Sequence, residues 1–258
     1  MKITLPSGGF FFSTHSLYLR GIINHKSITM KKILLFITLI STGFLHSQMT
    51  FQLWNFNAKP GMESAIAELA ESQWGDAKFK SGGIQIERIG HGDNEWSHRV
   101  ILFGEIGKIG RVEGDLEEYE WDLFAERLNN YVDKWGTSYA GRFLSLVGGA
   151  WKDFPYVQIY DLKLDDPAAF KKAHDKIVAQ TSKSRGDRPV GFGTYDIGGG
   201  NSISHWVAVG SKNFEDLMSQ KVANDKYVKE WAEWNKNNGG AESPSNYTIR
   251  VLASYPKN

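Results

Sequence analysis

A seven-residue pattern occurs twice in this 258-residue chain and restricts its fold more than any other feature. Residues 94–100 have the sequence Asn-Glu-Trp-Ser-His-Arg-Val, and residues 201–207, which lie 107 positions later, have Asn-Ser-Ile-Ser-His-Trp-Val. The same offset carries Pro60 onto Pro167, each at the start of a helical pattern, and Gly92 onto Gly199, each in a turn. These correspondences predict a tandem duplication.

The order of predicted elements repeats in the same way. Apolar runs bounded by turn residues predict strands, and apolar residues at helical spacing predict helices. Each half therefore has the order βαββαβ. The first half has predicted strands at 51–56, 84–89, 97–106 and 142–147 and predicted helices at 62–74 and 116–135. The second half has predicted strands at 156–164, 190–197, 204–210 and 247–253, with one helix that begins at Pro167 and another over 214–235. The polar stretch 219–225 predicts a break in the last helix.

A βαββαβ unit is a split-βαβ, ferredoxin-like sheet that carries helices on one face only, so its bare face needs a cover. We therefore expect an α+β fold of two tandem ferredoxin-like halves, packed sheet to sheet as a pseudo-dimeric α/β barrel. Residues 50–256 resemble the dimeric α/β-barrel superfamily in a single-chain, duplicated form. By that resemblance the relatives include antibiotic-biosynthesis-type monooxygenases, muconolactone-isomerase-like enzymes and haem-binding relatives of chlorite dismutase, so the fold does not select a function.

The N-terminal region has the pattern of a secretory signal. Met30-Lys31-Lys32 precedes a short apolar run, 33–40, and then small residues, which is the order of a signal peptide with cleavage near Ser47-Gln48. The run is shorter than the roughly 20 residues of a transmembrane helix. The expected organisation is a non-native or disordered extension at 1–29, a signal peptide at 30–48, and halves at 49–150 and 151–258. We therefore expect an exported protein, periplasmic or secreted, that has no stable insertion in a membrane.

Charge and cysteine content narrow the classes of partner. Residues 1–48 contain five basic residues and no acidic one, which leaves 25 basic and 29 acidic residues and a net charge of −4. A mildly acidic body argues against nucleic acid as a partner. The chain has no cysteine, so disulfides do not stabilise it. The partner expected is a small molecule, and the oligomeric state stays open.

The paired hairpins suggest one candidate catalytic pair. If the first connection is a four-residue turn, Ile89 faces His98, and the 107-residue offset then places Asp196 opposite His205. A carboxylate facing an imidazole fixes its tautomer and raises its basicity, as a general base requires. His205 and Asp196 are therefore the catalytic candidates, although a solvated cross-strand pair is the commoner outcome.

Metal and cofactor sites have weaker support. Beyond residue 48 the chain has four histidines, and none has the spacing of a structural zinc site. His91 and His98 with Glu87 form a conceivable surface cluster, and His174 is where the haem-binding relatives suggest a haem contact, but solvated side chains are the simpler interpretation. No metal and no cofactor are expected.

Aromatic residues complete the candidate list. Trp54, Trp96, Trp151 and Trp206 lie on or beside predicted strands, where the space between two sheets would hold a small apolar molecule. The predicted ligand-binding residues are His98, Trp96, Trp206 and Trp54. Gly191-Phe192-Gly193 lacks the context of a phosphate loop and predicts a closely packed strand.

Two functions remain after the sequence. The first is an exported barrel protein that binds a small, partly apolar molecule or is purely structural. The second is a small-molecule enzyme, similar to cofactor-free monooxygenases or isomerases, that uses the His-Asp pair of the second half. A filled barrel favours the first function, and an open cavity reached by His205 favours the second.

Overall fold

A computed structural model describes residues 48–257, apart from 93, 94, 116 and 201 and the side chain of residue 118. The predicted extension at 1–29 and nearly all of the predicted signal peptide at 30–48 lie outside the described residues. So do Asn94 and Asn201, which open the two copies of the repeated pattern.

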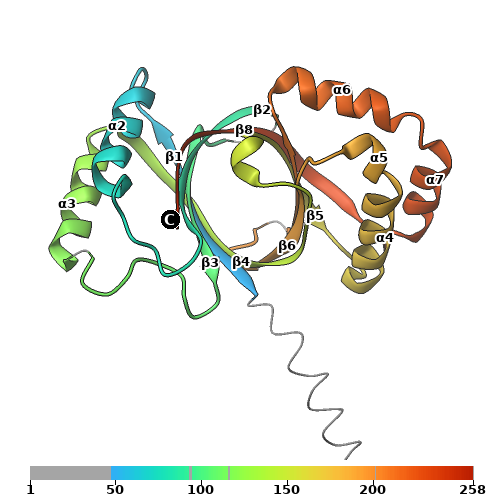
Figure 1. Cartoon of the computed structure of the whole chain (residues 1–258), viewed down its shortest axis with the longest axis horizontal. Helices are drawn as coiled ribbons and strands as arrows, with labels where there is room; N and C mark the ends of the chain where they lie inside the picture. Colours follow the sequence, from blue (N-terminus) through green and yellow to red (C-terminus); the bar gives the residue numbers. More distant parts are fainter. Residues whose placement is uncertain (1–47, 93–94, 116, 201, 258) are drawn as a thin grey trace, which may run out of the picture. The chain divides into compact units, whose positions relative to one another are not determined.

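Eight strands and six α-helices make up most of the described part of the chain (Figure 1). The first part contains β1 (Met49–Ala58), α2 (Glu63–Trp74), β2 (Gly83–Gly92), β3 (His98–Glu105), α3 (Glu118–Asn129) and β4 (Val132–Val147). The second contains the short 3-10 helix η2 (Trp151–Asp153), β5 (Tyr156–Lys163), α4 (Pro167–Gln180), α5 (Ser182–Arg185), β6 (Val190–Ile197), β7 (His205–Ser211), α6 (Phe214–Asn224), α7 (Val228–Asn237) and β8 (Glu242–Pro256).

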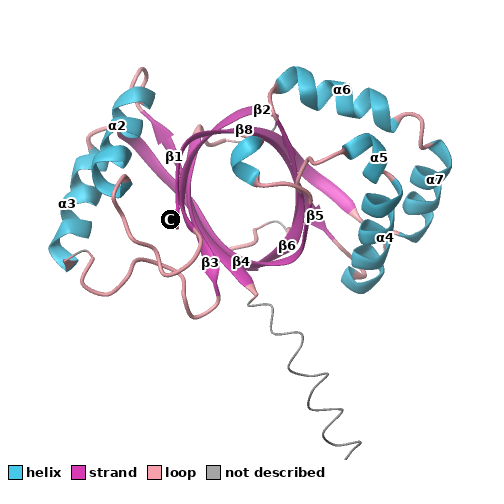
Figure 2. Ribbon diagram, in the orientation of Figure 1, coloured by secondary structure: helices cyan, strands magenta, loops and turns pink. Residues whose placement is uncertain are grey.

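The strands form one closed antiparallel barrel in the order β1-β3-β2-β8-β5-β7-β6-β4. The first four strands are ordered β4-β1-β3-β2 and the last four β8-β5-β7-β6, so both sets have the same order. The sets are joined where β4 pairs with β6 and β8 pairs with β2. Closure leaves no sheet edge unpaired. Figure 2 shows α2 and α3 on one side of the barrel and α4 to α7 on the opposite side.

Successive residues of each strand point alternately into the barrel and toward the helices. On β3, Ile101 and Phe103 pack in the barrel interior, whereas Val100 and Leu102 pack under α2 and α3. The apolar run 100–103 therefore belongs to a strand that packs on both of its faces.

The two helix-covered faces differ in how well they are filled. Twelve buried side chains, including Phe56, Trp74 and Phe124, form the cluster under α2 and α3. Among the described residues, the buried cluster on the other side consists of Leu162, Phe170 and Phe192, and Ala173, Ile177, Val190 and Leu217 are buried outside it. The second helical layer therefore stands over a much thinner core.

Two predicted boundaries need correction, the end of the helix at 116–135 and the start of the strand at 142–147, and one predicted break is confirmed. The helix predicted over 116–135 ends at Asn129, because β4 begins at Val132 and Trp135 pairs with Phe56 of β1. Strand pairing with β1 thus overrides the helical spacing of the aromatic residues. The last helix is broken between Asn224 and Val228, at the end of the polar stretch.

Within the described residues, no helix has the length and apolar character that crossing a membrane requires.

Candidate binding site inside the barrel

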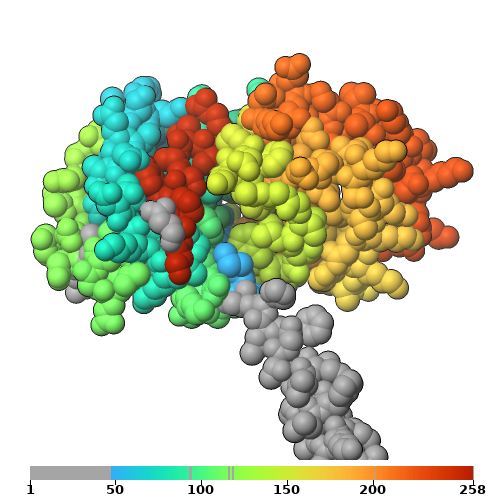
Figure 3. Space-filling view, viewed as in Figure 1, coloured from blue at the N-terminus to red at the C-terminus, as the bar shows by residue number. Residues whose placement is uncertain are grey.

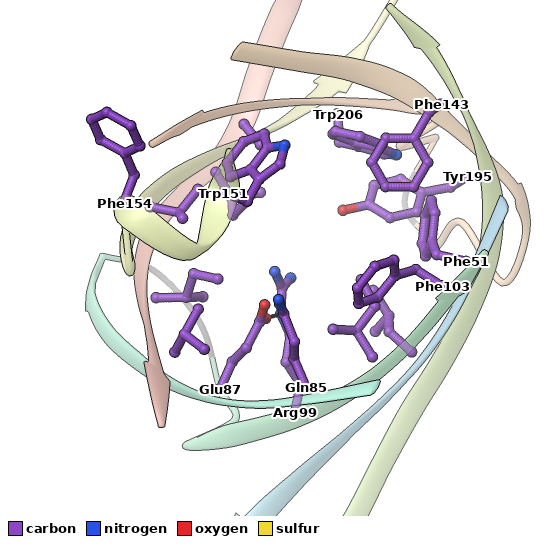
Figure 4. A pocket seen from close by; sticks show the side chains of 17 residues that line it. Phe51, Gln85, Glu87, Arg99, Phe103, Phe143, Trp151, Phe154, Tyr195 and Trp206 are labelled. Carbon is purple, nitrogen blue, oxygen red and sulfur yellow. Dashed lines mark hydrogen bonds and ion pairs between the residues drawn. The ribbon is translucent and has the colours of Figure 1, made fainter. Parts of the chain in front are cut away.

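The barrel encloses a cavity of about 130 Å³ to which all eight strands contribute side chains. Its walls are mostly apolar, and the polar lining residues are Gln85, Glu87, Arg99 and Tyr195. In Figure 4 the Arg99 guanidinium, Glu87 and the Tyr195 hydroxyl point toward the middle of the cavity. The site thus combines an apolar chamber with a few converging polar groups, the usual composition of a small-molecule site.

Four aromatic rings form one wall of the cavity. Phe51 of β1 lies edge-to-face against Phe143, Tyr195 and Trp206, with ring centroids 5.7–6.1 Å apart. Phe143 and Trp206 are in the same relation at 5.0 Å. These distances lie in the favourable range for aromatic pairs, so the wall is rigid.

Two glycines of β6 make room for the Trp206 ring. A Cβ on Gly193 would lie 2.4 Å from the indole of Trp206, and one on Gly191 would lie 3.1 Å from it. The predicted closely packed strand at 191–193 is therefore confirmed, and its neighbour is a cavity-lining tryptophan.

A buried ion pair forms the polar wall. Arg99 and Glu87, 5% and 3% exposed, face each other across β2 and β3, and the Arg99 Nε donates to Glu87 Oε2. Arg99 Nη1 also donates to the Tyr247 hydroxyl at 3.0 Å. Burial by itself lowers the pKa of Arg99, but the Glu87 carboxylate outweighs it and the pKa lies above its ordinary value. Arg99 is therefore a permanent charge inside the barrel.

A second polar pair lies nearby on β5 and β6. The Tyr195 hydroxyl donates to Asp161 Oδ1 at 2.8 Å. Burial raises the pKa of Asp161 despite this hydrogen bond and the Arg99 charge, and burial also raises the pKa of Tyr195 well above its ordinary value. A carboxyl group with a raised pKa beside a phenol is a plausible proton-transfer unit.

The segment between β4 and β5 covers one end of the barrel. It contains η2, and its residues Trp151 and Phe154 line the cavity. In Figure 3 the yellow-green atoms of this region occupy the middle of the barrel. Of the four tryptophans predicted near strands, Trp151 and Trp206 reach the cavity.

The predicted register of the catalytic pair is wrong. Thr194, not Asp196, lies opposite His205, and Arg88, not Ile89, lies opposite His98. Asp196 is two residues further along β6, where Arg142 donates to it at 2.8 and 2.9 Å. The Arg142 hydrogen bonds hold the pKa of Asp196 below its usual range.

Both histidines of the repeated pattern lie on the helix side of the barrel. His205 stacks on Phe192 with a centroid distance of 5.6 Å, and His98 stacks on Phe56 at 5.4 Å. Burial lowers the pKa of each histidine, while Asp196 partly opposes the shift at His205. Neither lines the central cavity. The catalytic role of His205 and Asp196 is not tested by this geometry, but the pair lies away from the chamber.

The conceivable metal cluster is not brought together. Glu87 points into the barrel toward Arg99, whereas His98 points to the helices and lies 3.7 Å from Glu63. His91 contacts the ring of Phe214. In the described parts of the chain, no group of three His, Asp or Glu side chains is placed to hold a metal ion.

The remaining predicted ligand contacts have separate locations. Trp206 lines the cavity, Trp96 packs beside the barrel-interior cluster with Lys134 over its ring, and Trp54 is 37% exposed. His174 is buried between Phe170 and Phe192. Its contact with a haem remains a prediction.

The sequence pattern did not point to Arg99, Tyr195 or Asp161, and it placed Glu87 in a surface cluster and not in the cavity. Strand alternation was the available signal. Arg99 lies two positions before Ile101 and four before Phe103, so in a strand that is buried on both faces the three side chains point to the same side. A charged residue at such a position needs a buried partner, which Glu87 supplies from the neighbouring strand.

No family model matches the chain, and no curated protein matches it. Solved structures show that its fold is that of the dimeric α/β-barrel proteins. A candidate monooxygenase from Lactobacillus acidophilus is similar, with a TM-score of 0.53 and 16% identity over 82% of this chain and 97% of that one. A candidate monooxygenase from Fusobacterium nucleatum has a TM-score of 0.51 and 12% identity over 83% and 97%. At these identities the likeness concerns the fold alone.

Proposed function

We propose that the barrel binds a small, mostly apolar molecule of about the size of a substituted benzene ring. The observation that carries this proposal is the central cavity itself, with apolar walls and a charged donor pointing into it. Dry apolar cavities of about 150 Å³ bind benzene or xenon, so a chamber of about 130 Å³ fits one ring. Larger ligands require the lining to move.

The polar end of such a ligand is best placed at Arg99. Its Nε and Nη1 are bonded to Glu87 and Tyr247. These two bonds leave Nη2 as the donor for a ligand oxygen. A phenol or a small aromatic carbonyl compound meets both requirements: a ring for the aromatic wall and an acceptor for Arg99.

Calorimetric titration tests this proposal with phenol and benzene as probes. We expect phenol to bind at one site and more tightly than benzene, because only phenol offers an acceptor to Arg99. Ala208→Leu places a larger side chain in the cavity and is expected to abolish both binding events. Ala140→Leu, on the outer side of β4 next to the inward-facing Tyr139, is the matched control and should bind as the original chain does. Phenol binding that survives Ala208→Leu, or no binding by the original chain, contradicts the proposal.

An enzyme of the cofactor-free monooxygenase or isomerase type is the second candidate. The Tyr195–Asp161 pair favours an enzyme, because the Tyr195 side chain lines the cavity and the Asp161 carboxyl has a raised pKa. A base of that kind could remove a proton from a phenolic or carbonyl substrate bound beside Tyr195. This pair replaces His205 and Asp196 as the preferred acid-base candidate.

Oxygen uptake and isomerisation assays with a panel of phenols and cyclic enones test the second candidate. If the chain is an enzyme, we expect Asp161→Asn to lower the rate by about a hundredfold or more, as loss of a general base does. His205→Gln should leave it unchanged. The reverse pattern would make His205 and Asp196 the preferred acid-base candidates again. If no compound is turned over, binding remains the proposed function.

We also infer that the chain arose by tandem duplication of a ferredoxin-like unit and that it is exported. The equal strand order of the two sets supports the duplication. The signal-like residues 30–48 support the export.

A further inference from the structure

A second, larger cavity lies outside the barrel wall, between the outer face of β5, β6 and β7 and the helices α4, α6 and α7. Its volume is about 1020 Å³, at the upper end of the range for small-molecule sites. Val207 and Leu162 form part of its floor, and Phe170, Leu217 and Trp231 belong to the helices above. The side chains of the central cavity point the other way from the same strands, so the two sites are distinct.

The cavity exists because the second helical layer does not fill its interface with the barrel. No residue of α7 is fully buried, and Trp231 and Trp234 line the cavity instead of closing it. On the opposite side of the barrel, twelve buried side chains fill the corresponding space. Apolar walls around an unfilled space forfeit packing energy, which a bound apolar molecule restores.

Three residues of the lining each carry a buried polar atom that lacks a partner among the described residues. The atoms are Gln220 Oε1, Arg185 Nε and Trp234 Nε1. Gln220 is only 6% exposed, and its amide nitrogen already donates to Asn224. Buried polar groups in folded proteins are almost always satisfied, so these unpaired atoms show that the packing beside the cavity is incomplete.

The charge of the lining favours an acidic ligand. Lys221 and Arg185 contribute two positive charges, and Asp225 contributes one negative charge. Lys221 Nζ is held 3.1 Å from the Tyr160 hydroxyl, at the cavity lining. His174 does not add a charge near neutral pH, because burial lowers its pKa to about 4.

We propose that this cavity binds a long-chain amphipathic carboxylate of the fatty-acid type. Eight lining residues are leucine, isoleucine or valine, which suit a flexible aliphatic chain. The carboxylate would lie near Lys221 and Arg185, the two cationic side chains of the lining.

Displacement of the fluorescent probe anilinonaphthalene sulfonate from the full chain by palmitate tests the proposal. We expect palmitate to displace the probe and hexadecanol to do so more weakly. Lys221→Met should weaken palmitate binding by about fivefold, the effect of one partly exposed charge, and leave hexadecanol unchanged. Lys172→Met, an exposed lysine of α4 that does not line the cavity, is the matched control and should change neither.

Val207→Phe fills the cavity floor and is expected to weaken palmitate binding at least tenfold while phenol binding in the barrel stays unchanged. Circular dichroism confirms that the variant folds, and Lys221→Met decides the question if it does not. The proposal is overturned if palmitate displaces no probe, or if Val207→Phe folds and binds it normally. It is also overturned if haem alone binds and His174→Ala removes its absorption shift, since the occupant is then a planar macrocycle.

Discussion

Replacing Arg99 by methionine is expected to lower the free energy of unfolding by about 3–5 kcal/mol, because Glu87 then remains inside the barrel as an unpaired charge. Both side chains are almost fully buried, so few water molecules can take over the role of the guanidinium. The Tyr247 hydroxyl loses its donor in the same variant. Urea unfolding of the original and variant chains at pH 7 measures the loss.

The double variant Arg99→Met with Glu87→Met distinguishes the loss of the whole ion pair from the burial of one unpaired charge. Apolar side chains of similar length replace both charges, and such replacements of buried ion pairs are often neutral or stabilising. We therefore expect the double variant to regain most of the stability lost by Arg99→Met. Arg88→Met is the control, since Arg88 pairs with Glu63 at the surface and its loss should cost no more than about 1 kcal/mol.

Strict additivity in this cycle, or a cost of under about 1 kcal/mol for Arg99→Met, would show that the pair is hydrated in solution.

The same variants bear on function. A folded double variant retains the aromatic wall but lacks the donor, so phenol should lose its advantage over benzene. The pair thus supplies specificity at a site whose affinity comes from the rings.

Element order was enough to predict the barrel. The repeated βαββαβ pattern leaves each sheet with a bare face, and closure of eight strands satisfies both sheets at once. The broken last helix was also predictable from the polar residues 219–225. Boundaries failed where a strand competed with a helix: the spacing of Tyr131 and Trp135 suits a helix, but Trp135 pairs with Phe56 of β1 and the Tyr131 carbonyl accepts from the backbone of Lys59, which follows β1.

The register of the hairpins could not be predicted from the repeat. The offset of 107 residues would make the two hairpins equivalent, yet the facing pairs are Arg88–His98 and Thr194–His205, which differ by one residue under that offset. Turn geometry sets register, and a shift changes which side chains face each other. Asp196 therefore joined Arg142 and not His205.

The repeated pattern also concealed the site. Its histidines and valines, His98 and Val100 in one copy and His205 and Val207 in the other, turn toward the helices. The position between His and Val differs, being Arg99 in one copy and Trp206 in the other, and this position faces the cavity. The residues that are identical in the two copies thus belong to the scaffold, and the position that differs between the copies holds the functional candidates.

Acid is expected to destabilise the chain through His174. Its pKa is lowered to about 4 in the folded protein, by burial first, with Lys171 adding to the shift and Asp175 opposing it. The unfolded chain, with an ordinary histidine pKa of 6.5, binds more protons between these values, and stability therefore falls as the pH falls. A shift of this size is worth about 3 kcal/mol by pH 4.

His174→Phe isolates this contribution. The substituted ring can stack between Phe170 and Phe192 as the imidazole does, but it cannot take up a proton. Between pH 7 and pH 4 the stability of the original chain should fall by about 3 kcal/mol more than that of the variant, since the other titrating groups are common to both. Urea unfolding at the two pH values measures the difference. Parallel losses in the two chains would mean that His174 reaches water in the folded state, and the thin core under α4 would then be open to solvent.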